Sequence, residues 1–380
     1  MKRIVCASLV VFLVSVCAAA STITVTATGS CPVDPDAIQA AVSSAAPGDV
    51  IELSPGNPAT EFNFTCLPAG TTAVVIGPTK IGITLAGVPS STVIRGPGPA
   101  GLPVNFGFRV QASGVTIRDL TVRGFFEGIR IVAASGFPPP SHVTVTHSQL
   151  EGNRIGVFVR TNVDHASLTN NTVLVPAPPN SDFLGPWGTT FGLAIAPGCD
   201  DLLIAENTVV GPGRVANIQR VDDVVMDNTG QAVNLRTVGA LQFDVGPPVS
   251  RLGRFSGNSF TGLDLGLQAS SDAGVVTRNT VINSAVGIVI SNDAEDGVTT
   301  VRDDIVALNT AAGNLIGILI HSGSGNVIAL NDASGNSVAG VAFVQTADGA
   351  ASQDNVFLRN KGSLANVAGN QGLAVPDLVP

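Results

Sequence analysis

The sequence is poor in charge and in aromatic side chains. Charged residues make up 12% of the 380 residues, there is no tyrosine, and there is one tryptophan. Lysine occurs only at Lys2, Lys80 and Lys361. So few charges do not suit a protein with many surface helices. The 43 glycines suit buried strands that are joined by tight turns.

Acidic residues outnumber basic ones, and the start of the chain is the most basic part. Residues 1–20 read as a signal peptide, because two basic residues precede an apolar run to Val16 and three alanines. The run is too short to span a membrane, and Cys17 leaves a lipoprotein anchor as an alternative. Without this segment, 17 basic and 28 acidic residues give a net charge of −11. This charge argues against nucleic acid or an anionic membrane as partner. We expect a secreted protein, extracellular or periplasmic.

One short pattern recurs through most of the chain. In Asn279–Ile290, an asparagine, a β-branched strand, a small polar turn, a glycine and a second strand follow one another. The pattern recurs at steps of 21 to 36 residues, of which the shortest give the basic unit and the longer ones carry loops. Internal repetition of this kind predicts a solenoid. The equivalent positions are Leu120, Ser148, Asn171, Asn207, Asn228, Asn258, Asn279, Asn309, Asn331 and Asn360.

The physics of this unit predicts stacked coils. Alternating apolar residues mark strands with one buried face, and the runs here are too short to be stable alone. Three such strands would make one coil, and coils about 4.8 Å apart would pair each strand with its copies. The asparagine amide would then bond to the next asparagine, because a buried amide without a partner costs about 1–3 kcal/mol. The predicted ladder comprises Asn171, Asn207, Asn228, Asn258, Asn279, Asn309, Asn331 and Asn360.

These residues carry a family resemblance. The anchor asparagine with its Gly-Ile or Gly-Val strand resembles the right-handed parallel β-helix proteins of the pectate-lyase-like superfamily. The N-terminal segments Ile38–Ala41, Ala46–Gly56, Lys80–Gly87 and Ser91–Gly96 resemble the capping helix and first coils of the same superfamily. The resemblance implies an all-β, right-handed parallel β-helix solenoid with three short strands per coil, about 11–12 coils and an N-terminal capping helix. The superfamily includes lyases, hydrolases, epimerases, adhesins and proteins without catalysis, so the implied chemistry stays open.

We therefore divide the chain into a signal peptide (1–20), an N-terminal strand, capping helix and loop (21–70), the β-helix (71–365) and a C-terminal tail (366–380). Asp34 or Asp36 can cap a helix over Ala37–Ala45. Cys31 and Cys66 flank this cap, and we expect a disulfide between them, since export allows disulfides. Cys199 would then be a small apolar filler.

Alternation along the Gly-Ile strands predicts an outward-facing polar strip. Substrate grooves of the superfamily often run over such a face, and arginines there could pair with uronate carboxylates. The alternative is a solvated strip whose arginines have no ligand. By this count the strip holds no Asp or Glu for acid/base chemistry. The candidate substrate-binding residues are Arg130, Arg160, Gln219, Arg236, Gln268 and His321.

An insertion over Pro176–Gly188 holds the one tryptophan, Trp187. Trp187 could be an aromatic platform or lid against a sugar ring, and we include it among the candidate substrate-binding residues. The alternative is a proline-rich flap that packs on the flank of the solenoid.

Aspartates recur five to seven residues before the anchors, and Asp201 and Asp223 are the candidate calcium ligands among them. Turns can also bear stacked carboxylates without a metal, so no cofactor is required. Asp164-His165 is similar to the Asp-Pro-His of alginate epimerases, but the proline and any tyrosine are missing.

Two hypotheses from different classes remain. In the first, an exported β-helix protein binds an extracellular acidic polysaccharide and cleaves or modifies it, as a polysaccharide lyase or a glycoside hydrolase would. In the second, the solenoid is a non-catalytic surface, adhesion or scaffold protein. We expect a monomer in either case. The identity of the glycan, and whether any bond is broken, stay open.

Overall fold

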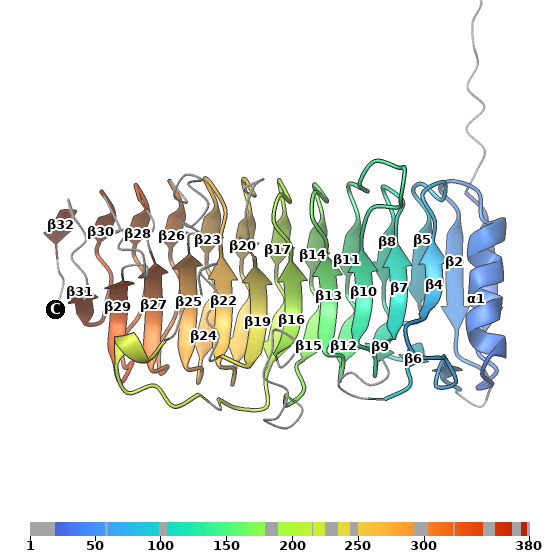
Figure 1. Ribbon diagram of the computed structural model, residues 1–380, viewed down its shortest axis with the longest axis horizontal. Coiled ribbons are helices and arrows are strands. Elements are labelled where there is room, and N and C mark those ends of the chain that lie inside the picture. Colours follow the sequence, from blue (N-terminus) through green and yellow to red (C-terminus); the bar gives the residue numbers. More distant parts are fainter. Residues whose placement is uncertain are drawn as a thin grey trace, which may run out of the picture.

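The structure is a computed structural model that describes residues 20–57, 60–98, 105–178, 189–214, 216–224, 235–243, 250–291, 303–321, 324–344, 354–366 and 374–377. The chain is a right-handed parallel β-helix in which short strands of successive coils stack side by side (Figure 1). The described strands form three parallel sheets, here called A, B and C. No helix among the described residues is long and apolar enough to cross a membrane.

Each sheet takes one strand from most coils. The strands of sheet A are β1 (Thr22–Thr26), β2 (Val50–Ser54), β5 (Thr84–Gly87), β8 (Thr116–Arg118), β11 (Thr144–Thr146), β14 (Ser167–Thr169), β17 (Leu203–Ala205), β20 (Arg254–Ser256), β23 (Val275–Thr277), β26 (Ile305–Ala307), β28 (Val327–Ala329), β30 (Val356–Leu358) and β32 (Ala374–Asp377). Those of sheet B are β3 (Phe62–Asn63), β6 (Val93–Arg95), β9 (Thr121–Arg123), β12 (Gln149–Glu151), β15 (Thr172–Leu174), β18 (Thr208–Val210), β21 (Ser259–Thr261) and β24 (Thr280–Ile282). Those of sheet C are β4 (Thr72–Ile76), β7 (Phe106–Val110), β10 (Glu127–Ile131), β13 (Ile155–Val159), β16 (Thr190–Ile195), β19 (Thr237–Gln242), β22 (Leu265–Ala269), β25 (Val286–Ser291), β27 (Ile316–His321), β29 (Ala339–Val344) and β31 (Leu364–Asn366).

The asparagine ladder is present between sheets A and B. Each ladder asparagine except the last, Asn360, donates from Nδ2 to Oδ1 of the asparagine in the next coil at 2.8–3.0 Å. It begins where the backbone N–H of Ser148 donates to Oδ1 of Asn171, 3.1 Å away. The rungs are Asn171, Asn207, Asn258, Asn279, Asn309, Asn331 and Asn360.

Asn228 is not a rung, and the prediction of a coil around it is wrong. Asn207 bonds directly to Asn258, and β18 pairs directly with β21. The described residues between β18 and β19, 211–214, 216–224 and 235–236, are here called the strap. Asn228 itself lies outside the described residues.

The strap covers part of sheet C from outside. Its described residues Ile218, Val221, Val224 and Leu235 pack in a second apolar cluster with outward side chains of sheet C. Its short helix η2 (Val221–Asp223), yellow-green in Figure 1, packs against β29. The β-helix therefore has one core inside the coils and a smaller one under the strap.

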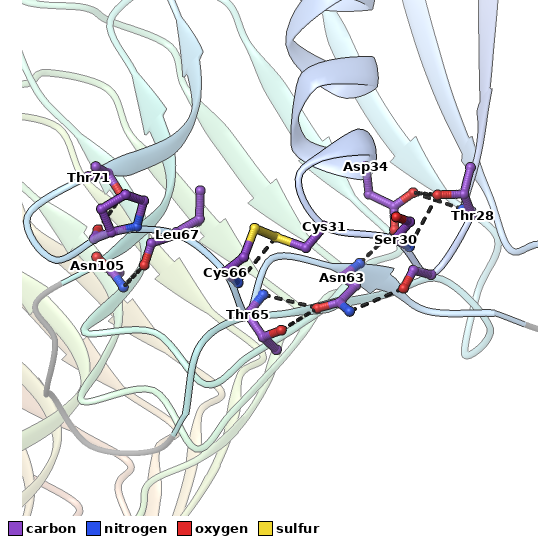
Figure 2. Close-up of a disulfide and its surroundings, with 12 residues drawn as sticks. Thr28, Ser30, Cys31, Asp34, Asn63, Thr65, Cys66, Leu67, Thr71 and Asn105 are labelled. Atoms are coloured by element: carbon purple, nitrogen blue, oxygen red, sulfur yellow. Dashed lines mark hydrogen bonds between the residues drawn. A yellow bond between two sulfur atoms is a disulfide. The ribbon is translucent and has the colours of Figure 1, made fainter.

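The N-terminal end is closed by helix α1 (Val33–Ser44), which begins earlier than predicted. Asp34 does not cap it. Its carboxylate is fully buried and accepts hydrogen bonds from Thr28 and from the backbone N–H of Asn63 (Figure 2). Cys31 and Cys66 form the expected disulfide across the same region (Figure 2). Both contacts fasten the cap to the first coils.

Candidate functional site

The outer face of sheet C has an open half and a covered half. Side chains that point away from the core form two rows across the stacked strands. On β7, β10, β13 and β16, one row holds Phe106, Glu127, Ile155 and Phe191, and the other holds Arg109, Arg130, Phe158 and Ala194. From β19 to β29 both rows are buried, and most of their side chains pack in the strap cluster. On the four earlier strands Glu127, Ile155 and Ala194 are buried, whereas the arginines and phenylalanines of the two rows are partly exposed. We call the part over β7, β10, β13 and β16 the open face.

Arginines and a phenylalanine pack closely at the centre of the open face. Arg130 bonds to both carboxylate oxygens of Glu127 through Nε and Nη2, and its guanidinium lies 4.0 Å from the centroid of the Phe106 ring. Arg109 is the register partner of Arg130 on the next strand, and its Nε has no hydrogen-bond partner among the described residues. Two guanidinium groups beside one carboxylate leave a net positive charge. This arrangement suits an anionic ligand.

Aromatic rings extend the open face towards the strap. The Arg160 guanidinium lies 4.8 Å from the centroid of the Phe158 ring. The ring centroid of Phe243 lies 6.4 Å from that of Phe158 and 5.7 Å from that of Phe191. Phe158, Phe191 and Phe243 are partly exposed, so apolar ring surface and guanidinium charge are offered together.

Arg154 adds a buried positive charge at the margin of the open face. Its Nε donates to the carbonyl of Thr189, its guanidinium lies 5.2 Å from the centroid of the Phe126 ring, and its Nη2 has no partner among the described residues. Burial lowers the pKa of the Arg154 guanidinium. The normal pKa of arginine is so high that the group stays charged at neutral pH.

Four of the predicted substrate-binding residues do not lie on the open face. Gln268 and His321 are 1% and 4% exposed on the covered half, so neither can meet a polysaccharide in this arrangement. Their strands were expected to face solvent, but the strap cluster covers the neighbouring outward residues. Gln219 and Arg236 lie in the strap rather than on strands of sheet C. Arg130 and Arg160 are the two predicted residues of the strip that lie on or beside the open face.

The candidate calcium ligands lie on separate elements. Asp201 is in the turn before β17, where its Oδ2 is 3.4 Å from Nε2 of His165. Asp223 is in η2, and its Oδ2 accepts the backbone N–H groups of Gln219 and Arg220, which lower its pKa. Among the described residues, no group of three or more His, Cys, Asp or Glu side chains is placed to hold a metal. The structure therefore does not bring the two aspartates together.

Trp187 and Cys199 are the two remaining residues to which the sequence analysis gave a role. Trp187 lies outside the described residues, so its role stays a prediction. Cys199 is fully buried inside the coils, and burial raises the pKa of its thiol to about 12. A thiol with this pKa stays protonated and unreactive at neutral pH.

Glu127 and Arg109 were missed by the sequence reading. The outward count started after the glycine of each repeat, whereas β10 begins at Glu127, directly before Gly128. Glu127 thus belongs to the outer row and is a carboxylate on a face predicted to have none. Arg109 precedes the first anchor, but Gly107-Phe108-Arg109 has the same pattern as Gly128-Ile129-Arg130. Comparing these segments would have found it.

Comparisons with known proteins support the fold and go no further. No family model matches the sequence, and no curated protein matches it. Among solved structures, the chain is similar to the Dettilon tailspike protein (15% identity, TM-score 0.50, 94% of this chain and 56% of that one). It is also similar to the tailspike protein of E. coli bacteriophage HK620 in complex with a pentasaccharide (11% identity, TM-score 0.51, 89% of this chain and 62% of that one). The chain thus spans less than two thirds of either tailspike. At these identities the similarity establishes the parallel β-helix and nothing about activity.

Proposed function

We propose that the chain is an exported β-helix protein that binds an acidic polysaccharide on the open face of sheet C. The observation that carries this proposal is the pair Arg109 and Arg130 on adjacent strands. Arg130 is already neutralised by Glu127, whereas half-buried Arg109 beside it has no carboxylate partner among the described residues, and its buried Nε has no hydrogen-bond partner there either. A sugar carboxylate is the ligand that the accessible part of such an unpaired guanidinium group binds best.

The surroundings of the pair fit a polymer. Strands of sheet C follow one another about every 4.8 Å, so a chain laid along the solenoid axis meets a new row of side chains at each coil. Phe106 and Phe158 offer ring surface beside the guanidinium groups of Arg130 and Arg160. A uronic acid, with an apolar ring face and a carboxylate, matches both features.

Export is supported by two observations. The sequence begins with a signal-peptide pattern. The Cys31–Cys66 disulfide is of the kind that persists in oxidising compartments.

The proposal is limited to binding. Acid/base cleavage of a glycosidic bond usually takes two carboxyl groups that flank it. Within the described residues, the open face holds one carboxylate, Glu127, and both of its oxygens accept hydrogen bonds from Arg130.

Affinity measurements on the chain without residues 1–20 test the proposal. We expect binding to polyuronates such as polygalacturonate or alginate, weakening with salt, and little binding to neutral dextran. Arg109→Gln should weaken polyuronate binding by about tenfold or more, because a charge-assisted hydrogen bond is worth about 1.5–3 kcal/mol. Arg95→Gln is the matched control, since Arg95 is an exposed arginine on β6 of sheet B.

Two results would refute this function. One is equal binding of acidic and neutral polymers by the unaltered chain. The other is equal loss of polyuronate affinity in Arg109→Gln and Arg95→Gln. If no polymer binds at all, the non-catalytic scaffold or surface protein becomes the better interpretation.

A further inference from the structure

The outer face of sheet A changes character along the solenoid. On β5, β8, β11 and β14 the first outward residue is Thr84, Thr116, Thr144 or Ser167. On β23, β26, β28 and β30 the same row holds Val275, Ile305, Val327 and Val356. We call the outward surface of these four strands the apolar face. Ile305 is 45% exposed and the three valines are partly exposed. A contiguous exposed apolar surface marks an interaction site in many soluble proteins.

Leucines in the adjoining turns make the apolar face costly for an isolated chain. Leu308 and Leu330 have φ angles of 59° and 56°, and their side chains are 48% and 49% exposed. Asparagine, aspartate and glycine adopt such φ angles more easily than leucine does. Because about half of each leucine side chain stays exposed, each gains only part of the stabilisation that full burial would give. A contact with another molecule would offset both costs.

Charges of opposite sign line the two long edges of the apolar face. Asp303 and Asp354 lie in the turns that precede β26 and β30, and both are exposed. Arg278 and Arg359 lie in the turns that follow β23 and β30, in line with Leu308 and Leu330, and both are exposed. One edge is therefore acidic and the other basic.

We propose that the apolar face is the interface with a second copy of this chain, related by a two-fold axis parallel to the solenoid axis. Such an axis exchanges the left and right edges of two facing surfaces but keeps the height along the solenoid. The acidic edge of each copy then meets the basic edge of the other, and Asp354 faces Arg359 of the partner subunit twice. A two-fold axis across the solenoid would instead set acidic edge against acidic edge. Charge complementarity thus selects a parallel dimer.

The charge complementarity between two copies does not extend to the coil of β17. The coil of β17 carries acids on both edges, at Asp201 and Glu206, and would repel its own copy. Four strands about 4.8 Å apart give a contact about 19 Å long, whereas a square patch of the roughly 800 Å² that each partner buries in a standard interface is about 28 Å across. We therefore propose, in place of the monomer expected from the sequence, a weak, reversible dimer with a dissociation constant on the order of micromolar.

Charge reversal tests the axis. Asp354→Lys places two positive charges opposite each other, and Arg359→Glu places two negative ones. Each variant alone should dimerise about tenfold more weakly in sedimentation-velocity runs over a concentration series. An equimolar mixture of the two should recover the unaltered affinity. In the mixed dimer the introduced lysine of one copy faces the introduced glutamate of the other, and the second contact keeps its native Asp354 and Arg359. Arg95→Glu, on sheet B, is the control and should change nothing.

The turn leucines test the contact. Leu308→Asn with Leu330→Asn puts a residue suited to positive φ at both turns, so the monomer should melt at the same temperature or higher while the dimer is lost. Leu174→Asn removes a leucine of 37% exposure on β15 and should leave the dimer intact.

The proposal is overturned if the unaltered chain stays monomeric up to about millimolar concentration. It is also overturned if the double leucine variant dimerises as tightly as the unaltered chain, or if the mixture of Asp354→Lys and Arg359→Glu does not recover the dimer affinity of the unaltered chain. All of these measurements concern self-association, so none of them depends on polysaccharide binding.

Discussion

Asn207 and Asn258 are adjacent rungs of one ladder, although 51 residues separate them in the sequence. Nδ2 of Asn207 donates to Oδ1 of Asn258 at 3.0 Å, and the backbone N–H of Asn207 donates to the same oxygen. The intervening residues comprise a single coil with the strap inserted. Stacking of side-chain amides therefore follows coil geometry rather than sequence spacing.

Replacing a ladder asparagine by leucine should destabilise the fold. In Asn279→Leu the chain loses the bonds from Nδ2 to Asn309 and to the carbonyl of Phe255, and the amide groups of Asn258 lose their acceptor. Because several buried polar groups lose partners, we expect a loss of about 2–4 kcal/mol in the free energy of unfolding. Chemical denaturation measures it.

The control for this variant is Asn283→Leu. Asn283 is exposed in a turn with φ 55°, so leucine there should cost about 1 kcal/mol, from the backbone alone. Equal losses in the two variants would refute a stabilising role for the ladder.

The same ladder shows what sequence reasoning can and cannot reach. The rungs were predictable because each sits in a local pattern of fixed spacing. Asn228 matched the pattern, with Val225 three residues before it, yet a strap that packs from outside also needs apolar residues at intervals. Local spacing alone cannot separate these two cases.

The covered half of sheet C could have been recognised from β25 and β27. Val-Gly-Ile-Val-Ile and Ile-Gly-Ile-Leu-Ile are apolar on both faces, as in strands buried on both sides, whereas β10 carries Glu127 and Arg130 outward. What the sequence could not supply was the cover itself. The strap reaches this face through long-range contacts that no local pattern encodes.

The base of the strap should depend on Asp264. Its carboxylate is buried and accepts the backbone N–H of Ala216 at 2.8 Å, of Arg236 at 2.9 Å and of Thr237 at 3.2 Å, so it joins the start of the strap to its end. Asp264→Ala leaves these three donors, of which Thr237 is fully buried and the other two partly buried, without this acceptor. We expect faster hydrogen exchange at Ala216 and Arg236 and faster tryptic cleavage within 211–236.

Exposed Asp303 provides the control, because Asp303→Ala should leave exchange and cleavage in the strap unchanged. A strap that stays protected in Asp264→Ala would show that its apolar residues, including Ile218 and Val221, suffice to hold it.

The Cys31–Cys66 disulfide should stabilise the capped end. It joins residues that are 35 apart, and closure of a loop of this size is worth about 3–4 kcal/mol on the chain-entropy model. Reductant should therefore lower the melting temperature of the unaltered chain. The same treatment should not affect Cys31→Ala with Cys66→Ala, and an equal shift in both would assign the effect to something other than the disulfide.

Asp304 lies in a second row of stacked polar side chains inside the coils. Its backbone N–H donates to Oδ1 of Asn326, whose own N–H donates to Oδ1 of Asn355, each at 2.9 Å. Oδ1 of Asp304 accepts the N–H of Gly274, whereas Oδ2 has no partner among the described residues. Burial, with a smaller contribution from Asp272 and Asp303, raises the pKa of Asp304 to about 8.

Stability should consequently fall as the pH rises through the neutral range. The folded chain holds a proton on Asp304 up to about pH 8, whereas the unfolded chain releases it near pH 3.9. Between these values the folded state binds more protons, so each step up in pH costs stability until the dependence levels off above pH 8.

Asp304→Asn imitates the protonated acid and matches the next two rungs, Asn326 and Asn355. We expect it to be more stable than the unaltered chain by a few kcal/mol at pH 8 and about equal to it at pH 4. Urea unfolding at a series of pH values measures both curves, and an unchanged slope in Asp304→Asn would mean that another group titrates.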